Sequence, residues 1–216
     1  VNLLGSMRLF EWCARSKTPV IYLSSSVVYA DQPSGPISEN VQVNPGTVYG
    51  VCKIACENFL KILGEGYELP WTVLRLFATY GAGHKPSKTQ GIVNIMLTQL
   101  LEGDQIVVKG SLQRSRDMLY VDDAASGILL AAEKYSDPEP LNLGSGIEIS
   151  IKDLANLIIK TMNANLKISW DINKPNGQPK RCVSIEKAKN KIGFNPKVSL
   201  EDGLKLTIDS FINKNN

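Results

Sequence analysis

Histidine is almost absent from this chain, because His84 is the only one among 216 residues. A histidine-rich metal site is therefore excluded, and no Ser–His pair is present for nucleophilic catalysis. The longest apolar run is far too short to cross a membrane. A net charge of +3 without a basic run or an aromatic platform argues against nucleic acid as a partner. We predict no metal, nucleic-acid or membrane partner.

Cysteine is also scarce, with four residues that form no metal-type cluster: Cys13, Cys52, Cys56 and Cys182. No secretory signal is visible, so we interpret them as reduced thiols of a cytoplasmic protein. The apolar share of 43% is sufficient for a packed core.

Helical and strand patterns alternate along the chain, which predicts an α/β fold with a largely parallel sheet. We expect helices over 2–16, 46–65, 91–102, 122–134, 151–163 and 200–213. We expect strands over 19–24, 71–77, 105–109, 116–121, 140–143 and 166–170, and loops over 35–45, 81–91 and 174–180. Ser150 followed by Asp153 predicts a capping box at the fifth helix.

A tyrosine and a lysine four residues apart, Tyr49 and Lys53, would lie on one face of a helix. A free phenol titrates near pH 10, and bringing its pKa to neutrality requires about 4 kcal/mol, which a nearby cation and a hydroxyl hydrogen bond can supply. Upstream, three serines at 24–26 close an apolar stretch and would place a hydroxyl at a strand end. Together these groups make a proton-transfer site for converting an alcohol to a ketone, lacking only a hydride carrier. The alternative is an exposed tyrosine beside a surface lysine, with serines that satisfy a turn.

Five stretches occur in an order that resembles the extended short-chain dehydrogenase/reductase family, the NAD-dependent epimerase/dehydratases of nucleotide sugars. They are SSSVVY at 24–29, YGVCK at 49–53, LRLFATYG at 74–81, RDMLYVDD at 116–123 and LNLGSG at 141–146. The resemblance extends from Asn2 to about Phe211. It implies a Rossmann-like doubly wound parallel sheet and a smaller C-terminal α/β substrate domain. Residues 1–82 would belong to the Rossmann domain and 83–216 mainly to the substrate domain, with about 116–144 returning to the Rossmann sheet.

The Gly-rich turn G-x-x-G-x-x-G, with which that family holds the cofactor pyrophosphate, does not occur in these 216 residues. The start NLLGS at 2–6 looks like a helix start found about a third of the way along family members. We therefore expect that the first strands of the sheet are missing and that the chain is a fragment, the alternative being a truncated product. We expect these residues alone to bind NAD(H) too weakly for catalysis.

The resemblance assigns catalysis to Ser25, which lies four residues before Tyr29 of the Val-Tyr pair, and to Tyr49 and Lys53. Tyr49 would be the general acid/base, and Lys53 would lower its pKa. The predicted contacts with NAD or NADP come from Asn2, Ser24, Tyr49, Lys53 and Phe77. A helix N-cap is an equally good interpretation of Asn2.

The predicted substrate contacts are Ser25, Val27, Ala78, Asn94, Arg116 and Arg181. A guanidinium matches a diphosphate bidentately, so the two arginines are diphosphate candidates, although a surface ion pair is the alternative for each. Asp122 is interpreted as the cap of the following helix. The segment KPNGQPKR at 174–181 resembles one found in GDP-sugar reductases and epimerases.

Departures from the family pattern reduce the number of reactions that this chain could catalyse. Dehydratases carry acids at the positions of Ser26 and Val27, and decarboxylases commonly have Glu at the latter, so both reactions are disfavoured. Ala30 replaces a family glycine and Ala78 replaces an asparagine, which puts one substrate contact in doubt. We predict an epimerase or reductase that acts on a nucleotide sugar through a keto intermediate. The alternative is a catalytically idle binding protein of the same fold. The resemblance also implies a homodimer formed through helices 2–16 and 46–65.

Overall fold

A computed structural model describes residues 2–29, 35–85, 87, 90–103, 105–110, 114–135, 137–163, 167–171, 173 and 181–213. Among the helices in these ranges, none combines the length and apolar character that crossing a bilayer requires. Ala30 and the segment 174–180, both singled out in the sequence, lie outside the described residues.

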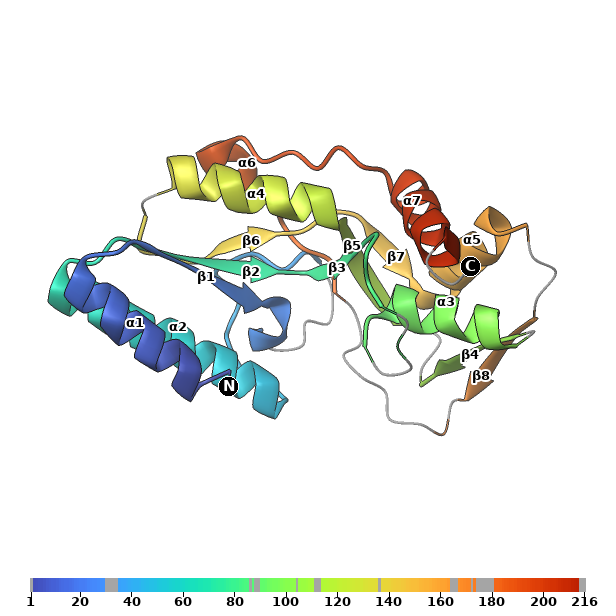
Figure 1. Ribbon diagram of the computed structural model, residues 1–216, viewed down its shortest axis with the longest axis horizontal. Coiled ribbons are helices and arrows are strands. Elements are labelled where there is room, and N and C mark those ends of the chain that lie inside the picture. The colour runs from blue at the N-terminus through green and yellow to red at the C-terminus, as the bar shows by residue number, and fades with distance from the viewer. Residues whose placement is uncertain are drawn as a thin grey trace.

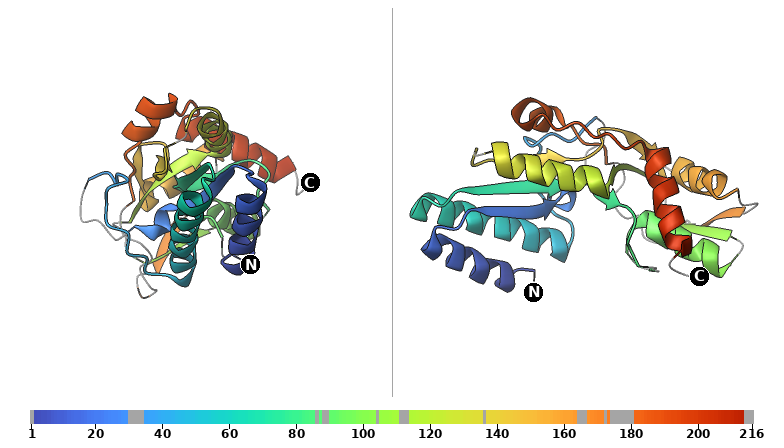
Figure 2. Two further views of the ribbon diagram at one scale, coloured as in Figure 1. Left: turned by 90° about the vertical axis from the view of Figure 1, so that its left-hand side faces the viewer. Right: turned by 45° about the horizontal axis from the view of Figure 1, so that its top comes forward.

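The first sheet is parallel and has three strands in the order β1-β2-β6. These are β1 (Val20–Ser25), β2 (Trp71–Leu76) and β6 (Leu141–Leu143). Helices α1 (Leu4–Ser16) and α2 (Val48–Tyr67) cover one face, and α4 (Val121–Lys134) and α6 (Glu186–Ile192) cover the other (Figures 1 and 2). The sheet therefore has the buried faces of a doubly wound layer, as predicted.

The remainder of the fold contains two smaller sheets. Strands β3 (Ala78–Tyr80), β5 (Ser115–Tyr120) and β7 (Glu148–Ser150) form one, in which β3 and β5 are parallel and β5 and β7 antiparallel. Strands β4 (Gln105–Lys109) and β8 (Lys167–Asp171) form the other. Helices α3 (Ile92–Glu102), α5 (Ile151–Thr161) and α7 (Leu200–Asn213) contribute to an apolar cluster with Ile106 and Tyr120.

The predicted α/β class and the long elements are confirmed, whereas two predicted helix caps are wrong. The N-cap of α1 is Leu3 rather than Asn2, and it makes no side-chain cap hydrogen bond. The N-cap of α4 is Tyr120, so Asp122 lies inside the first helical turn. Ser150 is the N-cap of α5, because its Oγ accepts a 3.0 Å hydrogen bond from Asp153 N, and the Asp153 carboxylate accepts from the Ser150 hydroxyl at 2.6 Å. β6 joins the first sheet, and the proposed domain division stays a prediction.

Close packing of α2 on the sheet gives a stability prediction. A Cβ atom at the buried Gly64 would lie 2.1 Å from Cδ1 and Nε1 of Trp71, which is 8% exposed. Gly64→Ala is therefore expected to lower the free energy of unfolding by about 1–3 kcal/mol, as overpacking does. Gly66→Ala, on the same helix with nothing within 4 Å, is the control and should be neutral or stabilising. Urea denaturation of both variants checks this, and equal midpoints would contradict it.

Candidate active site

Helix α2 places Tyr49 and Lys53 at the carboxyl end of β1. The side chain of Thr47 caps the helix by accepting a 3.1 Å hydrogen bond from Gly50 N, which puts Tyr49 in the first turn. Lys53 Nζ donates a 2.7 Å hydrogen bond to the Leu23 carbonyl and lies 5.6 Å from the centroid of the Tyr49 ring. Tyr49 is 45% exposed, so a ligand can reach this residue.

Ser25 ends β1 and begins a short 3-10 helix, Ser26–Val28. We call residues 25–29 the Ser25 turn. Its conformation is fixed in part by Ser25 Oγ, which accepts a 3.4 Å hydrogen bond from Val27 N. The side chain of Ser25 also lies close enough to Tyr49 to favour its phenolate and so to lower its pKa. The structure thus joins Ser25, Tyr49 and Lys53 in one cluster.

Burial is the main influence on the pKa values of Tyr49 and Lys53. Burial raises the pKa of Tyr49 above its usual value, and the Ser25 side chain only opposes that rise. Burial lowers the pKa of Lys53, while the charges of Cys56 and Glu57 oppose that change. Lys53 is not among the causes of the Tyr49 pKa change in the free chain, where its ammonium donates to the Leu23 carbonyl, and its effect on that pKa stays a prediction.

Three of the residues predicted to contact the cofactor already have protein partners. Ser24 is buried, and its hydroxyl donates to the carboxylate of Glu57. Phe77 is buried in an apolar cluster beside Tyr29. Asn2 is exposed, and its carbonyl accepts a hydrogen bond from Cys56 Sγ at 3.3 Å. Their roles toward a cofactor stay predictions.

The residues predicted to contact the substrate lie on several elements. Val27 lies in the Ser25 turn and Ala78 begins β3. Asn94 on α3 is 3% exposed, and its Oδ1 has no hydrogen-bond partner within the described part of the chain. Arg116 on β5 is half-buried and donates to the Ser115 carbonyl at 2.6 Å. None of these contacts tests substrate binding, so the substrate roles of these four residues stay predictions.

Arg181 lies next to the Ser25 turn although it is far away in sequence. Its guanidinium is buried and donates to the carbonyls of Ser26 at 3.1 Å and Tyr29 at 3.2 Å. It therefore supports the backbone of the Ser25 turn. A contact with the substrate diphosphate stays a prediction.

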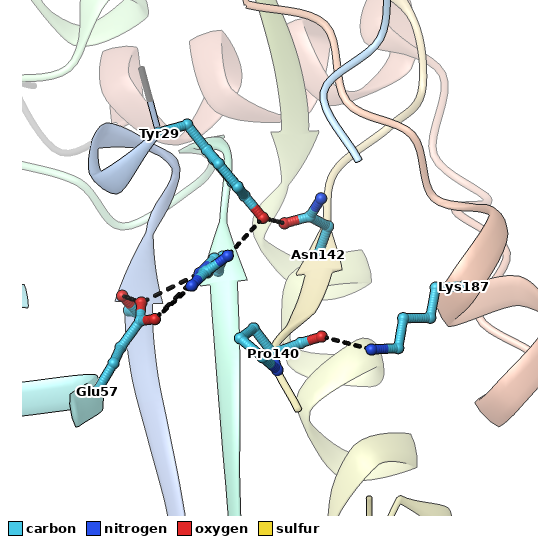
Figure 3. Close-up of polar contacts among 7 residues, drawn as sticks. Tyr29, Glu57, Pro140, Asn142 and Lys187 are labelled. Carbon is cyan, nitrogen blue, oxygen red and sulfur yellow. Dashed lines mark hydrogen bonds and ion pairs between the residues drawn. The ribbon is translucent and has the colours of Figure 1, made fainter. Parts of the chain in front are cut away.

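Sequence reasoning missed a buried polar network behind the cluster (Figure 3). It joins Glu57 on α2, Arg75 on β2, Tyr29 of the Ser25 turn and Asn142 on β6. A signal was present, because a charged Arg75 within the apolar strand WTVLRL requires a buried partner. Glu57, four residues after Lys53 and thus on the same helix face, was the available candidate.

Ser25, Tyr49 and Lys53 lie at the carboxyl end of a parallel strand. Open α/β proteins bind their ligands at this edge of the sheet, so the fold and the site place this chain in that class of protein. In the part of the chain that the structure describes, no three His, Cys, Asp or Glu side chains gather as a metal site would require. Residues 1–144 match the family described as "NAD dependent epimerase/dehydratase family". The chain belongs to this family.

Known relatives agree with that assignment. A putative UDP-glucose 4-epimerase of Methanocaldococcus jannaschii is 26% identical over 100% of this chain and 70% of its own length. The crystal structure of UDP-glucose 4-epimerase from Thermotoga maritima with UDP-glucose superposes with a TM-score of 0.93, at 30% identity over 100% of this chain and 70% of that chain. UDP-glucuronic acid 4-epimerase from Bacillus cereus in complex with NAD gives 0.89, at 26% identity over 100% of this chain and 68% of that one.

Proposed function

We propose that this chain carries the catalytic residues of an NAD- or NADP-dependent enzyme that epimerises or reduces a nucleotide sugar through a keto intermediate. The observation that supports this most directly is the cluster at the carboxyl end of β1, where Ser25 lies beside the half-exposed Tyr49 and the Lys53 ammonium is 5.6 Å from the Tyr49 ring. Relatives that act on UDP-sugars support the substrate class. We also propose a cytoplasmic location.

The residues present fit the nicotinamide half of the cofactor. Tyr49 and Lys53 offer a hydroxyl and an ammonium, at the sheet edge where open α/β folds bind ligands. When bound, the oxidised nicotinamide accepts a hydride from the sugar carbon whose hydroxyl loses its proton. No residues among the 216 supply the Gly-rich turn for the pyrophosphate.

Tyr49 would take the proton of the sugar hydroxyl, normally at C4. Because burial raises the pKa of Tyr49 in the free chain, the phenol needs additional positive charge to act as a base near pH 7. The Lys53 ammonium can supply it by turning from the Leu23 carbonyl, 2.7 Å away, toward a shared ligand. Ser25 would hydrogen-bond the same sugar oxygen and orient it. Ser26 and Val27 offer no acid for the elimination of water, so dehydration stays disfavoured in this proposal.

An assay of the full-length natural polypeptide with UDP- and GDP-sugars tests the function. Product NMR showing an epimer with no net change in NADH absorbance identifies an epimerase. Stoichiometric consumption of NADH or NADPH identifies a reductase. Binding without turnover across the panel would overturn the proposal in favour of the idle binding protein.

We further propose a homodimer formed through α1 and α2, which lie side by side on the outer face of the first sheet (Figure 1). Cys13, Cys56 and Leu60 of these helices are buried and pack in the cluster beneath them. Leu9 and Trp12 of α1 and Ile62 of α2 are 56%, 59% and 67% exposed and remain for a partner. Closed twofold pairs are the commonest soluble oligomers.

Trp12→Glu is therefore expected to convert the dimer to a monomer, because a charge cannot be buried in an apolar interface without a partner. Leu206→Glu, at a 49% exposed apolar position on α7, is the matched control and should remain dimeric. Light scattering at micromolar concentration measures both. A wild-type protein that is only monomeric would contradict the proposal.

A further inference from the structure

A buried ion pair lies directly behind the catalytic cluster. Glu57 and Arg75 are 5% and 4% exposed, and Arg75 Nη2 is 2.6 Å from Glu57 Oε2. Arg75 Nε also donates to both carboxylate oxygens at 3.2 Å. On its other side Arg75 Nη1 donates to the Tyr29 hydroxyl at 3.0 Å, which donates to Asn142 Oδ1 at 2.7 Å (Figure 3).

Stability alone is a poor explanation of such a pair. Removing two charges from water costs several kcal/mol per ion, and well-packed apolar residues often serve equally well or better. The residues that the pair contacts on each side offer a better explanation. Glu57 accepts a hydrogen bond from Ser24, the neighbour of Ser25, and lies one helical turn after Lys53. Tyr29 closes the Ser25 turn.

We propose that Glu57, Arg75 and Tyr29 are positioning residues that set the distance between Ser25 and the Tyr49–Lys53 face of α2. This inference rests on the proposed function. The connected groups come from the end of β1, from α2, from β2 and from the Ser25 turn. A rigid bidentate guanidinium between them fixes their spacing in a way that apolar contacts do not.

Two features make the proposal testable without unfolding the protein. The backbone of the Ser25 turn is held independently by Arg181, which donates to the carbonyls of Ser26 and Tyr29. The ring of Tyr29 is packed against Phe77, with the ring centroids 6.4 Å apart. Tyr29→Phe therefore removes one hydroxyl and leaves the turn packed.

The decisive variant replaces the ion pair with apolar residues, Glu57→Leu with Arg75→Met, in the full-length polypeptide. A purely structural pair predicts an unchanged kcat once the fold is retained. Positioning predicts that kcat falls about 10- to 100-fold, the cost of misplacing reacting groups, while KM for the nucleotide sugar changes less than about threefold. Tyr29→Phe should show a smaller loss of the same kind.

The control is the exposed pair Lys191–Asp137, whose charged atoms are 2.7 Å apart. Lys191→Met with Asp137→Leu should leave kcat unchanged. A second readout needs no turnover, namely an NMR titration of ring-labelled tyrosine, with the Tyr49 signal identified from Tyr49→Phe. Displacement of Ser25, whose side chain lowers the pKa of Tyr49, should raise that pKa further in the apolar double variant.

An unchanged Tyr49 titration in the folded double variant overturns the positioning role, as does a wild-type kcat. If the wild-type protein shows no turnover on any nucleotide sugar, the proposed function fails instead. The tyrosine titration still decides whether the network positions Ser25 against Tyr49.

Discussion

Tyr49→Phe is expected to lower kcat by at least about 10²-fold, the usual effect of removing a positioned acid/base. The substitution removes one oxygen from a half-exposed ring and leaves its ring contact with Lys53, so the fold should be retained. The measurement is steady-state turnover of the full-length polypeptide with its nucleotide sugar. Tyr67→Phe is the matched control, because Tyr67 lies on the same helix and is 46% exposed. Wild-type turnover in Tyr49→Phe would remove this residue from the mechanism.

The pH dependence of the rate tests the same role of Tyr49 independently. A raised pKa keeps Tyr49 protonated at neutral pH, so the base form grows as pH rises. The rate of sugar oxidation should therefore increase with pH through the pKa of Tyr49, and this rising limb should be absent from Tyr49→Phe. A persistent limb in the variant would assign the titration to another group.

Lys53→Met should lower kcat by a similar factor of about 10²-fold and should also weaken cofactor binding, since it removes the only cation placed beside the Tyr49 ring by the described residues. Methionine has nearly the same length, so the loss reports on charge and hydrogen bonding rather than on volume. Lys53→Arg, which keeps the charge, should recover part of the rate. Turnover and calorimetric titration with NADH measure the two effects.

Lys61→Met supplies the control for Lys53, two helical turns later on α2. Lys61 is exposed and makes only an i,i+4 pair with Glu65 at 4.0 Å, so its loss should leave kcat and cofactor affinity unchanged. Equal losses in Lys53→Met and Lys61→Met would indicate a general effect of charge on the helix instead of a site effect.

Most of the fold could be predicted because the long elements carry complete patterns. The apolar strand 71–76 and the helices on either side of it followed from periodicity and turn residues. The strands β3 and β7, with three residues each, and α6, with seven, were missed, whereas the equally short β6 was predicted within 140–143. The cap errors at Asn2 and Asp122 arose because a suitable side chain was present but the helix begins elsewhere.

Some residues of the site could likewise be predicted from the sequence, and others could not. The juxtaposition of Tyr49 and Lys53 is local and follows from helical spacing. The strand end predicted only that one of three serines lies there, and the choice of Ser25 came from the family resemblance. The partners of Arg75 and the position of Arg181 depend on tertiary contacts across many residues, which periodicity does not encode. The sign of the Tyr49 pKa change also depends on burial, and a sequence gives no burial for a residue at a site mouth.

The hydrogen bonds that hold the Ser25 turn come from residues that the ribosome adds much later. Tyr29 depends on Asn142, which lies 113 residues later, and on Arg181, 152 residues later. A ribosome delivers the chain from its N-terminus at roughly 5–20 residues per second. The turn therefore remains without its final hydrogen bonds for at least several seconds after it has been made. Ser25 is therefore translated well before Asn142 and Arg181, the residues that complete the hydrogen bonds around its turn.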